Sequence, residues 1–380
     1  MRLRPLLLPA LLASVLLAPD GAHAAERWTV PSQATVTLTG HGYGHGHGMS
    51  QYGAEGAARQ GLTHEQILAF YYPGTTVGQA AGRVSVQISA DTTDDLLVRP
   101  RAGLALRDLG TGKRWVLPAN GARLWRVVVR GGVTRVAFKS GGWQQWRTLS
   151  GAGEFSAGGR PVTLVTPAGD RPYRGRLRLL GGDTVNVLPL DGYLKGVVPL
   201  EMPATWSPAA VQAQAVAART YAAYERTARG TLCDTTSCQV YGGYAAEHPA
   251  SNAAVAATRR TVLLDAGKPA FTQFSSSSGG WTSAGSVPYL PAVADPYDGW
   301  AGNPVHAWTL RLDAGRLEQA WPKVGDLQSI TVTARDGNGE WGGRVRSLSL
   351  TGTGGTVSVS GDTFRSVLGL RSTYLTFAVG

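Results

Sequence analysis

The spacing of apolar residues predicts many short strands. Between residues 83 and 188, apolar and polar residues alternate in runs such as 84–88, 124–129, 133–138 and 177–187, and glycine pairs interrupt the runs. Similar patterns occur at 261–264, 270–274, 308–312, 330–333, 345–350 and 374–379. Alternation with a period of two is typical of half-buried strands, so the middle and the end of the chain should be rich in β-structure.

One long helix interrupts the strands. Ser207 is a good N-cap, Pro208 fits the first helical position, and residues 209–229 contain no helix breaker before Gly230. A stripe of small side chains should let this helix pack closely against a neighbour: Val211, Ala215, Ala218 and Ala222. Shorter helices are expected near 50–61, 64–71, 250–259 and 363–368. The predicted fold class is α+β, strand-rich around one long buried helix.

Residues 1–24 are typical of a secretory signal peptide. Arg2 and Arg4 precede an apolar run at 6–17, and residues 22–24 (Ala-His-Ala) offer a cleavage site. The run is too short to span a bilayer and no later stretch approaches about 20 apolar residues, so no membrane anchor is expected. We therefore expect a secreted protein, extracellular or associated with the cell wall. An uncleaved N-terminal tether is the alternative.

Composition and charge fit an exported, folded protein. The 380 residues include 51 Gly and 21 Pro, 43% are apolar, and the formal net charge is +11. A basic exported protein is attracted to anionic polymers, and the cell wall is the nearest one for a bacterial-type chain. Nucleic acid is not expected as a partner, because the arginines are scattered and no zinc-finger or basic-helix pattern occurs.

The chain has two cysteines, Cys233 and Cys238. An oxidising compartment favours a disulfide between them, which would stabilise the fold by about 2 kcal/mol. The alternative is half of a zinc site completed by His248 or another histidine, although an isolated C-x4-C pattern is nonspecific.

Glycine occupies every second position from 40 to 48, so this backbone can approach a ligand closely. His41, His45 and His47 alternate with these glycines and would share one face of a strand, an arrangement that suits zinc. A glycine-rich loop is flexible and would hold metal ligands poorly, so contact between a histidine and the substrate is the preferred interpretation. We expect that no cofactor is required.

Glu201 is a lone carboxylate in an apolar run between Pro199 and Pro203. Desolvation raises the pKa of such a carboxyl toward the range in which it donates a proton near neutrality. The alternative is a structural salt bridge to Arg219 on the following helix, and the pattern alone leaves both interpretations open. The serines at 275–278 are expected to form a polar turn, because no G-x-S-x-G elbow accompanies them.

Longer motifs resemble a known family. Residues 193–221 (Y-L-K-G-V-V-P-L-E-M-P, W-S-P and Q-A-Q-A-V-A-A-R-T-Y) resemble the core of the stage II sporulation protein D family, SpoIID/LytB, as do 233–241, 275–282 and 364–373. The likeness covers roughly 170–378. Residues 40–54 resemble the family's second signature, with His45 at the motif's histidine. That signature usually follows the C-terminal G-L-R-S-T segment, so we expect a circular permutation that brings His45 near Glu201.

The resemblance implies a lytic transglycosylase that cleaves peptidoglycan glycan strands, with Glu201 as catalytic acid/base. One carboxylate suffices for that reaction, because the sugar's own 6-hydroxyl replaces water. The residues expected to bind substrate are His45, Ser50, Gln51, Gln214, Arg219, Tyr221, Gln239, Tyr241, Ser277, Gly279 and Gly280. For each, the alternative is a buried polar residue that satisfies backbone groups. At the level of function, the alternatives are a noncatalytic wall-binding enhancer of a partner amidase and a structural scaffold.

The expected organisation has four parts: a signal peptide at 1–24, the Gly/His-rich motif with short helices at 25–78, a β-rich module at 79–169, and a SpoIID-like catalytic core at 170–380. Four tryptophans fall in or near the strand patterns of the β-rich module: Trp115, Trp125, Trp143 and Trp146. Exposed, they would suit stacking on sugar rings, but alternation along strands favours a role in the core.

Overall fold

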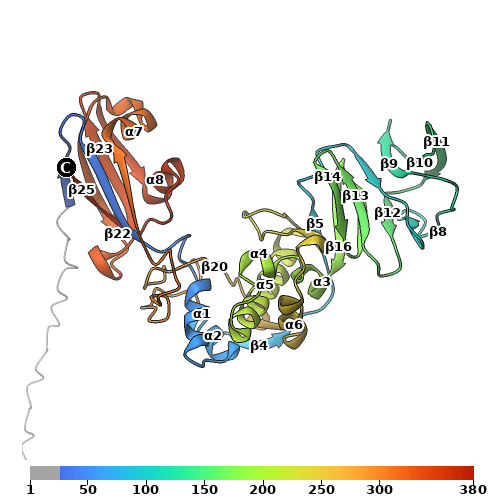
Figure 1. Ribbon diagram of the computed structural model, residues 1–380, viewed down its shortest axis with the longest axis horizontal. Coiled ribbons are helices and arrows are strands. Elements are labelled where there is room, and N and C mark those ends of the chain that lie inside the picture. Colours follow the sequence, from blue (N-terminus) through green and yellow to red (C-terminus); the bar gives the residue numbers. More distant parts are fainter. Residues whose placement is uncertain (1–25) are drawn as a thin grey trace, which may run out of the picture.

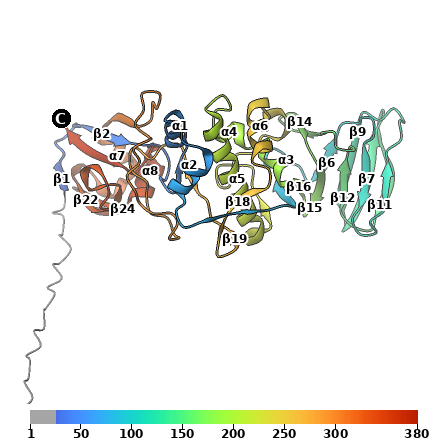
Figure 2. The same cartoon turned by 90° about the horizontal axis from the view of Figure 1, so that it is seen from below.

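A computed structural model describes residues 26–380, so the expected signal peptide lies outside the described residues. The described chain is elongated, with a C-terminal β-unit at one end, helices in the centre and a β-rich module at the other end (Figures 1 and 2). The fold mixes helices with several separate sheets, which agrees with the α+β class. Within residues 26–380, no helix is long and apolar enough to cross a membrane.

The centre is built around α5 (Pro208–Arg229), which begins after Ser207 and ends at Gly230, where φ is +79°. Thirteen of its residues are buried, many of them alanine, so neighbouring elements approach its backbone closely. The surrounding elements are α1 (Gln51–Arg59), α2 (His64–Tyr71), α3 (Leu190–Leu194), α4 (Val198–Glu201), α6 (Pro249–Ala257), and a small sheet of β19 (Lys268–Pro269), β18 (Thr261–Asp265) and β4 (Thr76–Gln79).

The β-rich module consists of two sheets that pack against each other. The first has the order β17 (Thr231–Leu232), β5 (Arg83–Gln87), β16 (Asp183–Pro189), β15 (Arg176–Leu180), β12 (Gly153–Ser156), β7 (Ala105–Asp108), β8 (Arg114–Val116). The second has the order β11 (Trp143–Leu149), β10 (Val133–Lys139), β9 (Leu124–Arg130), β6 (Asp95–Val98), β13 (Val162–Thr166), β14 (Gly169–Tyr173). Trp125 is buried between the sheets, whereas Trp143 is 38% exposed, so the tryptophans divide between core and surface.

The C-terminal unit incorporates the first described strands. β1 (Glu26–Thr29) pairs with β22 (Leu327–Arg335) in a sheet completed by β23 (Val345–Gly352) and β24 (Gly355–Ser360). β2 (Thr35–His41) lies between β21 (Ala307–Asp313) and β25 (Leu375–Val379), and α7 (Ala314–Ala320) and α8 (Gly361–Leu368) belong to the same unit. The Gly/His-rich segment therefore leads from this unit into the helical centre (Figure 1).

One expected strand is largely irregular. Of residues 270–274 only the last enters a strand, β20 (Phe274–Ser275), which pairs in parallel with β3 (Met49–Ser50). Tight turns precede it, because the Thr272 N–H donates to the Ala270 carbonyl and the Gln273 N–H to the Phe271 carbonyl. These turns bring Gln273 and Phe274 against the Gly/His-rich segment.

Candidate active site

Glu201 and His45 line the same pocket, although 156 positions separate them in the sequence. The pocket has a volume of about 300 Å³ and is also lined by Tyr221, Gln273, Phe274 and residues 236–238. Glu201 is the last residue of α4, Tyr221 projects from α5, and His45 lies in the loop between β2 and β3. The site therefore combines the helical core with the Gly/His-rich segment.

The Glu201 carboxyl is half-buried and accepts a 2.8 Å hydrogen bond from the Val240 N–H at Oε1. Burial raises its pKa above the ordinary value, while this bond and a hydrogen bond from the Gln51 side chain act in the opposite direction. Among the described residues, no lysine, arginine or histidine forms a salt bridge with Glu201. The carboxyl is thus desolvated without being neutralised by a cation, the environment that suits a proton donor.

The alternative salt bridge from Glu201 to Arg219 is absent from the described structure. Arg219 is fully buried and donates from Nε to Asp191 at 2.8 Å. Its other guanidinium nitrogens donate to the carbonyls of Val255 and Thr261. Arg219 therefore ties α5 to α3, α6 and β18, and it is not among the residues lining the pocket.

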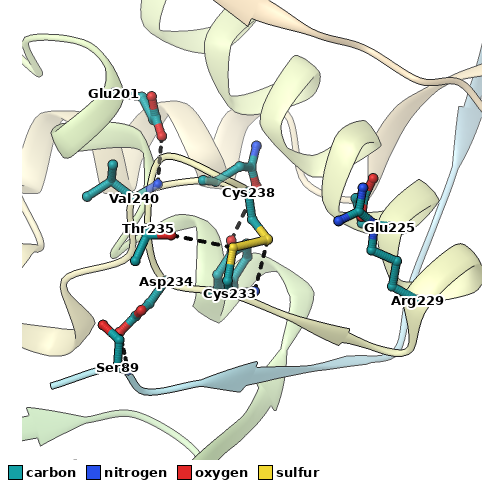
Figure 3. The surroundings of a disulfide bond; sticks show 11 residues. Ser89, Glu201, Glu225, Arg229, Cys233, Asp234, Thr235, Cys238 and Val240 are labelled. Atoms are coloured by element: carbon teal, nitrogen blue, oxygen red, sulfur yellow. Dashed lines mark hydrogen bonds and ion pairs between the residues drawn. A yellow bond between two sulfur atoms is a disulfide. The ribbon is translucent and has the colours of Figure 1, made fainter. Parts of the chain in front are cut away.

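A disulfide joins Cys233 to Cys238 and closes a short loop that ends just before Gln239 and Val240 (Figure 3). The loop is fixed at Asp234, whose carboxylate accepts the Ser89 N–H at 3.0 Å and whose carbonyl accepts the Tyr241 N–H at 3.1 Å. Figure 3 shows the Val240 N–H directed at Glu201. Residues 236–238 of the cross-linked loop therefore line the pocket, and Val240, which follows the loop, supplies the donor that contacts its carboxyl.

The backbone of the Gly/His-rich loop requires glycine. Gly46 and Gly48 have φ values of +80° and +65°, which side-chain-bearing residues rarely adopt. A Cβ at Gly48 would lie 2.1 Å from the Gln273 carbonyl oxygen, and one at Gly46 would lie 2.4 Å from the guanidinium of the buried Arg344. His45 stands directly before Gly46, so close packing at these glycines restricts the backbone that carries it.

His45 is held as a neutral hydrogen-bond donor. Its Nδ1 accepts the His47 N–H at 2.9 Å, so the proton of the neutral ring resides on Nε2. Burial, followed by the neighbouring His47 and the positive charges of Arg365 and Arg344, lowers the pKa of His45 to about 3. A hydrogen bond to the Phe274 backbone acts in the opposite direction on this pKa but does not offset burial, so His45 is uncharged near neutral pH.

Two of the three histidines of this segment stack on each other, and the third, His41, points elsewhere. His47 stacks on His45 with ring centres 4.9 Å apart, and its Nδ1 lies 3.1 Å from the Ser283 carbonyl. His41 points toward the C-terminal unit, where its Nε2 lies 2.9 Å from Glu340 and its ring stacks on Trp341. Over residues 26–380, no group of three or more His, Cys, Asp or Glu side chains is arranged to hold a metal ion.

The predicted glutamines lie behind the pocket. Gln51 donates to the Gln214 Oε1 at 3.4 Å, and Gln214 is fully buried on α5. Gln239 accepts from the Tyr193 hydroxyl and donates to the Ala218 carbonyl. The Tyr241 hydroxyl donates to Asn186 at 2.7 Å. Only Gln51 of this set contacts Glu201, and the others are bonded within the core.

The predicted serines and glycines surround a residue that sequence reasoning missed, Asp298. This fully buried carboxylate accepts hydrogen bonds from Ser50 Oγ at 2.6 Å, Ser277 Oγ at 2.8 Å and the Gly279 N–H at 3.0 Å, and it pairs with His306 at 2.8 Å. Burial opposes its ionisation, but the bonds from His306, Ser50 and Ser277 hold the pKa of Asp298 below its ordinary value. The same contact raises the pKa of His306.

Gly280 continues this turn, and its N–H donates to Ser278 Oγ at 3.2 Å. Ser50, Ser277 and Gly279 thus meet at a buried acid rather than in the pocket that holds Glu201. The sequence does contain a signal for this cluster. Asp295 and Asp298 stand three positions apart in a Gly/Pro-rich segment, and His306 follows them.

Comparison with known proteins adds to this geometry. Residues 181–264, which contain Glu201, α5 and the disulfide loop, match the model of the stage II sporulation protein family, SpoIID. Residues 181–264 belong to the SpoIID family. The SpoIID match starts directly after the last residue of β15 and leaves most of the β-rich module outside it.

Named relatives share part of the chain. The chain is 46% identical over 132 residues to the amidase enhancer of Bacillus subtilis (strain 168), covering 33% of this chain and 17% of that protein. It is 33% identical over 168 residues to the stage II sporulation protein D of Bacillus amyloliquefaciens, covering 37% and 47%. The corresponding protein of Bacillus subtilis (strain 168) is 32% identical over 163 residues, covering 36% and 46%. The chain thus spans less than half the length of these relatives.

Proposed function

We propose that this SpoIID protein is a secreted lytic transglycosylase that cleaves peptidoglycan glycan strands with Glu201 as general acid and base. The observation that carries the proposal is a single desolvated carboxyl without a cation partner, placed with a neutral histidine in one pocket. Among the described residues lining that pocket, Glu201 is the only carboxylate. Hydrolytic glycosidases ordinarily need two carboxyls, so a lone one favours the nonhydrolytic route.

The reaction needs one proton carrier. Protonated Glu201 gives its proton to the glycosidic oxygen as the bond between that oxygen and C1 breaks. The 6-hydroxyl oxygen of the same sugar then bonds to C1, and its proton returns to the Glu201 carboxylate. The products are a free hydroxyl end and a 1,6-anhydro end, and no water is consumed. The Val240 N–H stabilises the carboxylate formed between the two transfers, and His45 Nε2–H donates to a sugar oxygen or acetamide.

The arrangement of the Gly/His-rich segment is proposed to be a circular permutation. In the familiar order of the family this segment follows the G-L-R-S-T residues near the C-terminus. Here the His41 N–H donates to the Tyr374 carbonyl at 2.8 Å and the Gly44 N–H to the Arg371 carbonyl at 2.9 Å. The two segments therefore lie side by side although they stand at opposite ends of the chain, which is what a permutation requires.

The decisive experiment replaces Glu201 with glutamine. Glu201→Gln keeps the shape of the side chain and the bond from the Val240 N–H but removes the transferable proton. Anhydro ends should therefore form about 10²–10⁴-fold more slowly, the usual contribution of general acid–base catalysis. Mass spectrometry of purified glycan strands after incubation provides the measurement. Glu65→Gln on the exposed side of α2 is the matched control and should react at the wild-type rate. Unchanged release of anhydro ends by Glu201→Gln would refute the proposal.

A second function has its own support, the 46% identity to an amidase enhancer. As an enhancer, the protein would bind the wall and stimulate a cell-wall amidase without cutting glycan. The same variant separates the two functions. An enhancer produces no anhydro ends even as wild type, and its Glu201→Gln variant stimulates the purified amidase on whole wall as strongly as wild type does.

A further inference from the structure

The positive charge of the chain is concentrated in one region. Residues 83–180 contain 17 of the 36 Lys and Arg residues but only 6 of the 25 Asp and Glu residues, which gives a formal charge of +11. The rest of the chain has 19 of each sign and is formally neutral. The whole net charge therefore belongs to the β-rich module, and α5 with the Glu201 pocket lies in the neutral remainder (Figure 1).

Within the module, cations gather over tryptophans where the two sheets end. We call this set the arginine–tryptophan edge: Lys113, Trp115, Arg126, Lys139, Trp143, Trp146 and Arg147. The outer strands β8 and β11 supply most of it, and β11 lies at the far end of the molecule in both views (Figures 1 and 2). Trp115 and Trp146 bridge the two sheets with ring centres 6.2 Å apart.

The rings hold the cations rather than offering open faces. The Arg147 guanidinium lies 4.8 Å from the ring centre of Trp115 and 4.6 Å from that of Trp146. The Arg126 guanidinium lies 4.1 Å from the ring centre of Trp143. Stacking uses only the face of a guanidinium and leaves its in-plane N–H groups free of the ring. Arg147 is exposed, so its N–H groups reach solvent, whereas Arg126 is half-buried with its Nε shielded from solvent.

Few acidic side chains lie near these cations. In the described part of the chain, Lys113, Lys139 and Arg147 form no salt bridge, and Arg126 has only a long contact of 3.7 Å to Asp95. Lys113, Lys139 and Arg147 are exposed. An exposed row of held but unpaired guanidinium and ammonium groups matches a chain of phosphates, which arginine binds with two parallel hydrogen bonds.

We infer that the arginine–tryptophan edge binds a wall polymer of phosphodiester-linked polyol units. The module would hold the protein on this polymer while the Glu201 pocket meets the glycan strand. Single-stranded nucleic acid carries the same phosphates, but its binding sites stack bases on open aromatic faces. Here a guanidinium already lies over one face of Trp115, Trp143 and Trp146, so charge and geometry favour a polymer without bases. The inference does not depend on the chemistry of Glu201.

The test measures binding of the full chain to poly(glycerol phosphate). It also measures binding to isolated cell wall, before and after hydrofluoric acid has removed the phosphodiester polymers from that wall. The edge variant is Lys113→Gln/Arg126→Gln/Arg147→Gln. It should bind poly(glycerol phosphate) at least tenfold more weakly, with a shallower dependence of log affinity on log salt, because each lost phosphate contact lowers that slope by about 0.7. Wild type should bind acid-treated wall at least tenfold more weakly than untreated wall.

A matched variant removes the same charge elsewhere. Arg311→Gln/Arg316→Gln/Lys323→Gln changes three basic residues of the C-terminal unit and should bind poly(glycerol phosphate) like wild type. An equal loss in both triple variants would overturn the inference, because net charge alone would then explain binding. So would equal binding to acid-treated wall, or tighter binding to single-stranded DNA of the same charge. Glu201→Gln should bind as wild type does, so failure of this inference is distinguishable from failure of the catalytic proposal.

Discussion

Near α5 and the Gly/His-rich segment, several charged side chains are buried against partners, whereas in residues 83–180 most of the cations face solvent with few acids beside them. Arg219 with Asp191 and Asp298 with His306 illustrate the first arrangement. Arg147 on its two tryptophans illustrates the second. A buried charge loses its hydration and needs fixed partners, so it dictates how elements pack. An exposed charge keeps its hydration and is available to an outside partner.

The boundary of the family match follows the same division. The match begins at residue 181, next to the end of the charged module, and it contains Glu201 and the disulfide loop. Chemistry and attachment are therefore assigned to different parts of the molecule. If this division is correct, changes in the neutral core should affect stability or turnover, and changes in the module should affect binding.

The largest effect on stability is expected from Asp298→Asn. The new amide nitrogen would face the Gly279 N–H, the Asn303 amide and His306, which now donate to Asp298 Oδ2 or pair with it. Breaking a buried, hydrogen-bonded ion pair on one side costs about 3 kcal/mol or more. Urea unfolding at pH 5.5 measures the loss. Asp94→Asn, which breaks an exposed pair with Arg130 in the module, should leave the unfolding midpoint nearly unchanged.

The difference in stability between wild type and Asp298→Asn should depend on pH. The pKa of Asp298 is lowered in the folded protein, so its stabilising contribution is present above an unfolded pKa of about 4 and is lost as pH falls through the folded value. The pKa of His306 is raised, so its contribution is complete below about 6.5 and is lost as pH rises through the folded value. The stability gap between wild type and Asp298→Asn should therefore be widest between about pH 4 and 6.5. A gap that does not change with pH would mean that the pair is not ionised.

The sequence predicts those features that depend on local signals. Ser207, Pro208 and Gly230 are local signals for the ends of α5, and the structure places the helix between them. The capping box of Thr63 and Gln66 likewise opens α2. The capping box acts within one turn of helix, so it can be read without knowledge of tertiary contacts. Ser207 marks the start of α5 but makes no capping bond, and its hydroxyl donates to Glu55 of α1 instead.

Features that depend on distant contacts were harder to predict. The sequence lists Arg219 among the expected substrate-binding residues, with a salt bridge to Glu201 as the alternative, and it gives no sign that the hydrogen-bond partners of Arg219 come from α3, α6 and β18. Asp298 was overlooked because its partners span positions 50 to 306. The burial of Trp125 and exposure of Trp143 follow from the pairing of two sheets, which strand alternation alone does not specify.

A smaller effect is expected from opening the disulfide loop. Cys233→Ser/Cys238→Ser should lower the free energy of unfolding by about 2 kcal/mol, because the unfolded chain regains the freedom that the short loop removes. The Val240 N–H would also be held less firmly against Glu201, so release of anhydro ends should slow. Urea unfolding and the glycan assay measure the two effects. Wild type with its disulfide reduced should match the double variant, and an unaltered reaction rate would show that the loop does not position the donor.

The smallest effect on stability is expected from Arg147→Gln in the module. An exposed contact between a cation and an aromatic ring contributes about 0.5–1 kcal/mol, so urea unfolding should change by no more than that. Affinity for poly(glycerol phosphate) should fall in the same variant, and Arg147→Lys should recover part of it, because an ammonium keeps the charge but lacks the flat, two-pronged donor. A loss of stability as large as that of Asp298→Asn would mean that Arg147 holds the module together. The charges of the two regions would then act alike, and the reason for assigning attachment to the module would disappear.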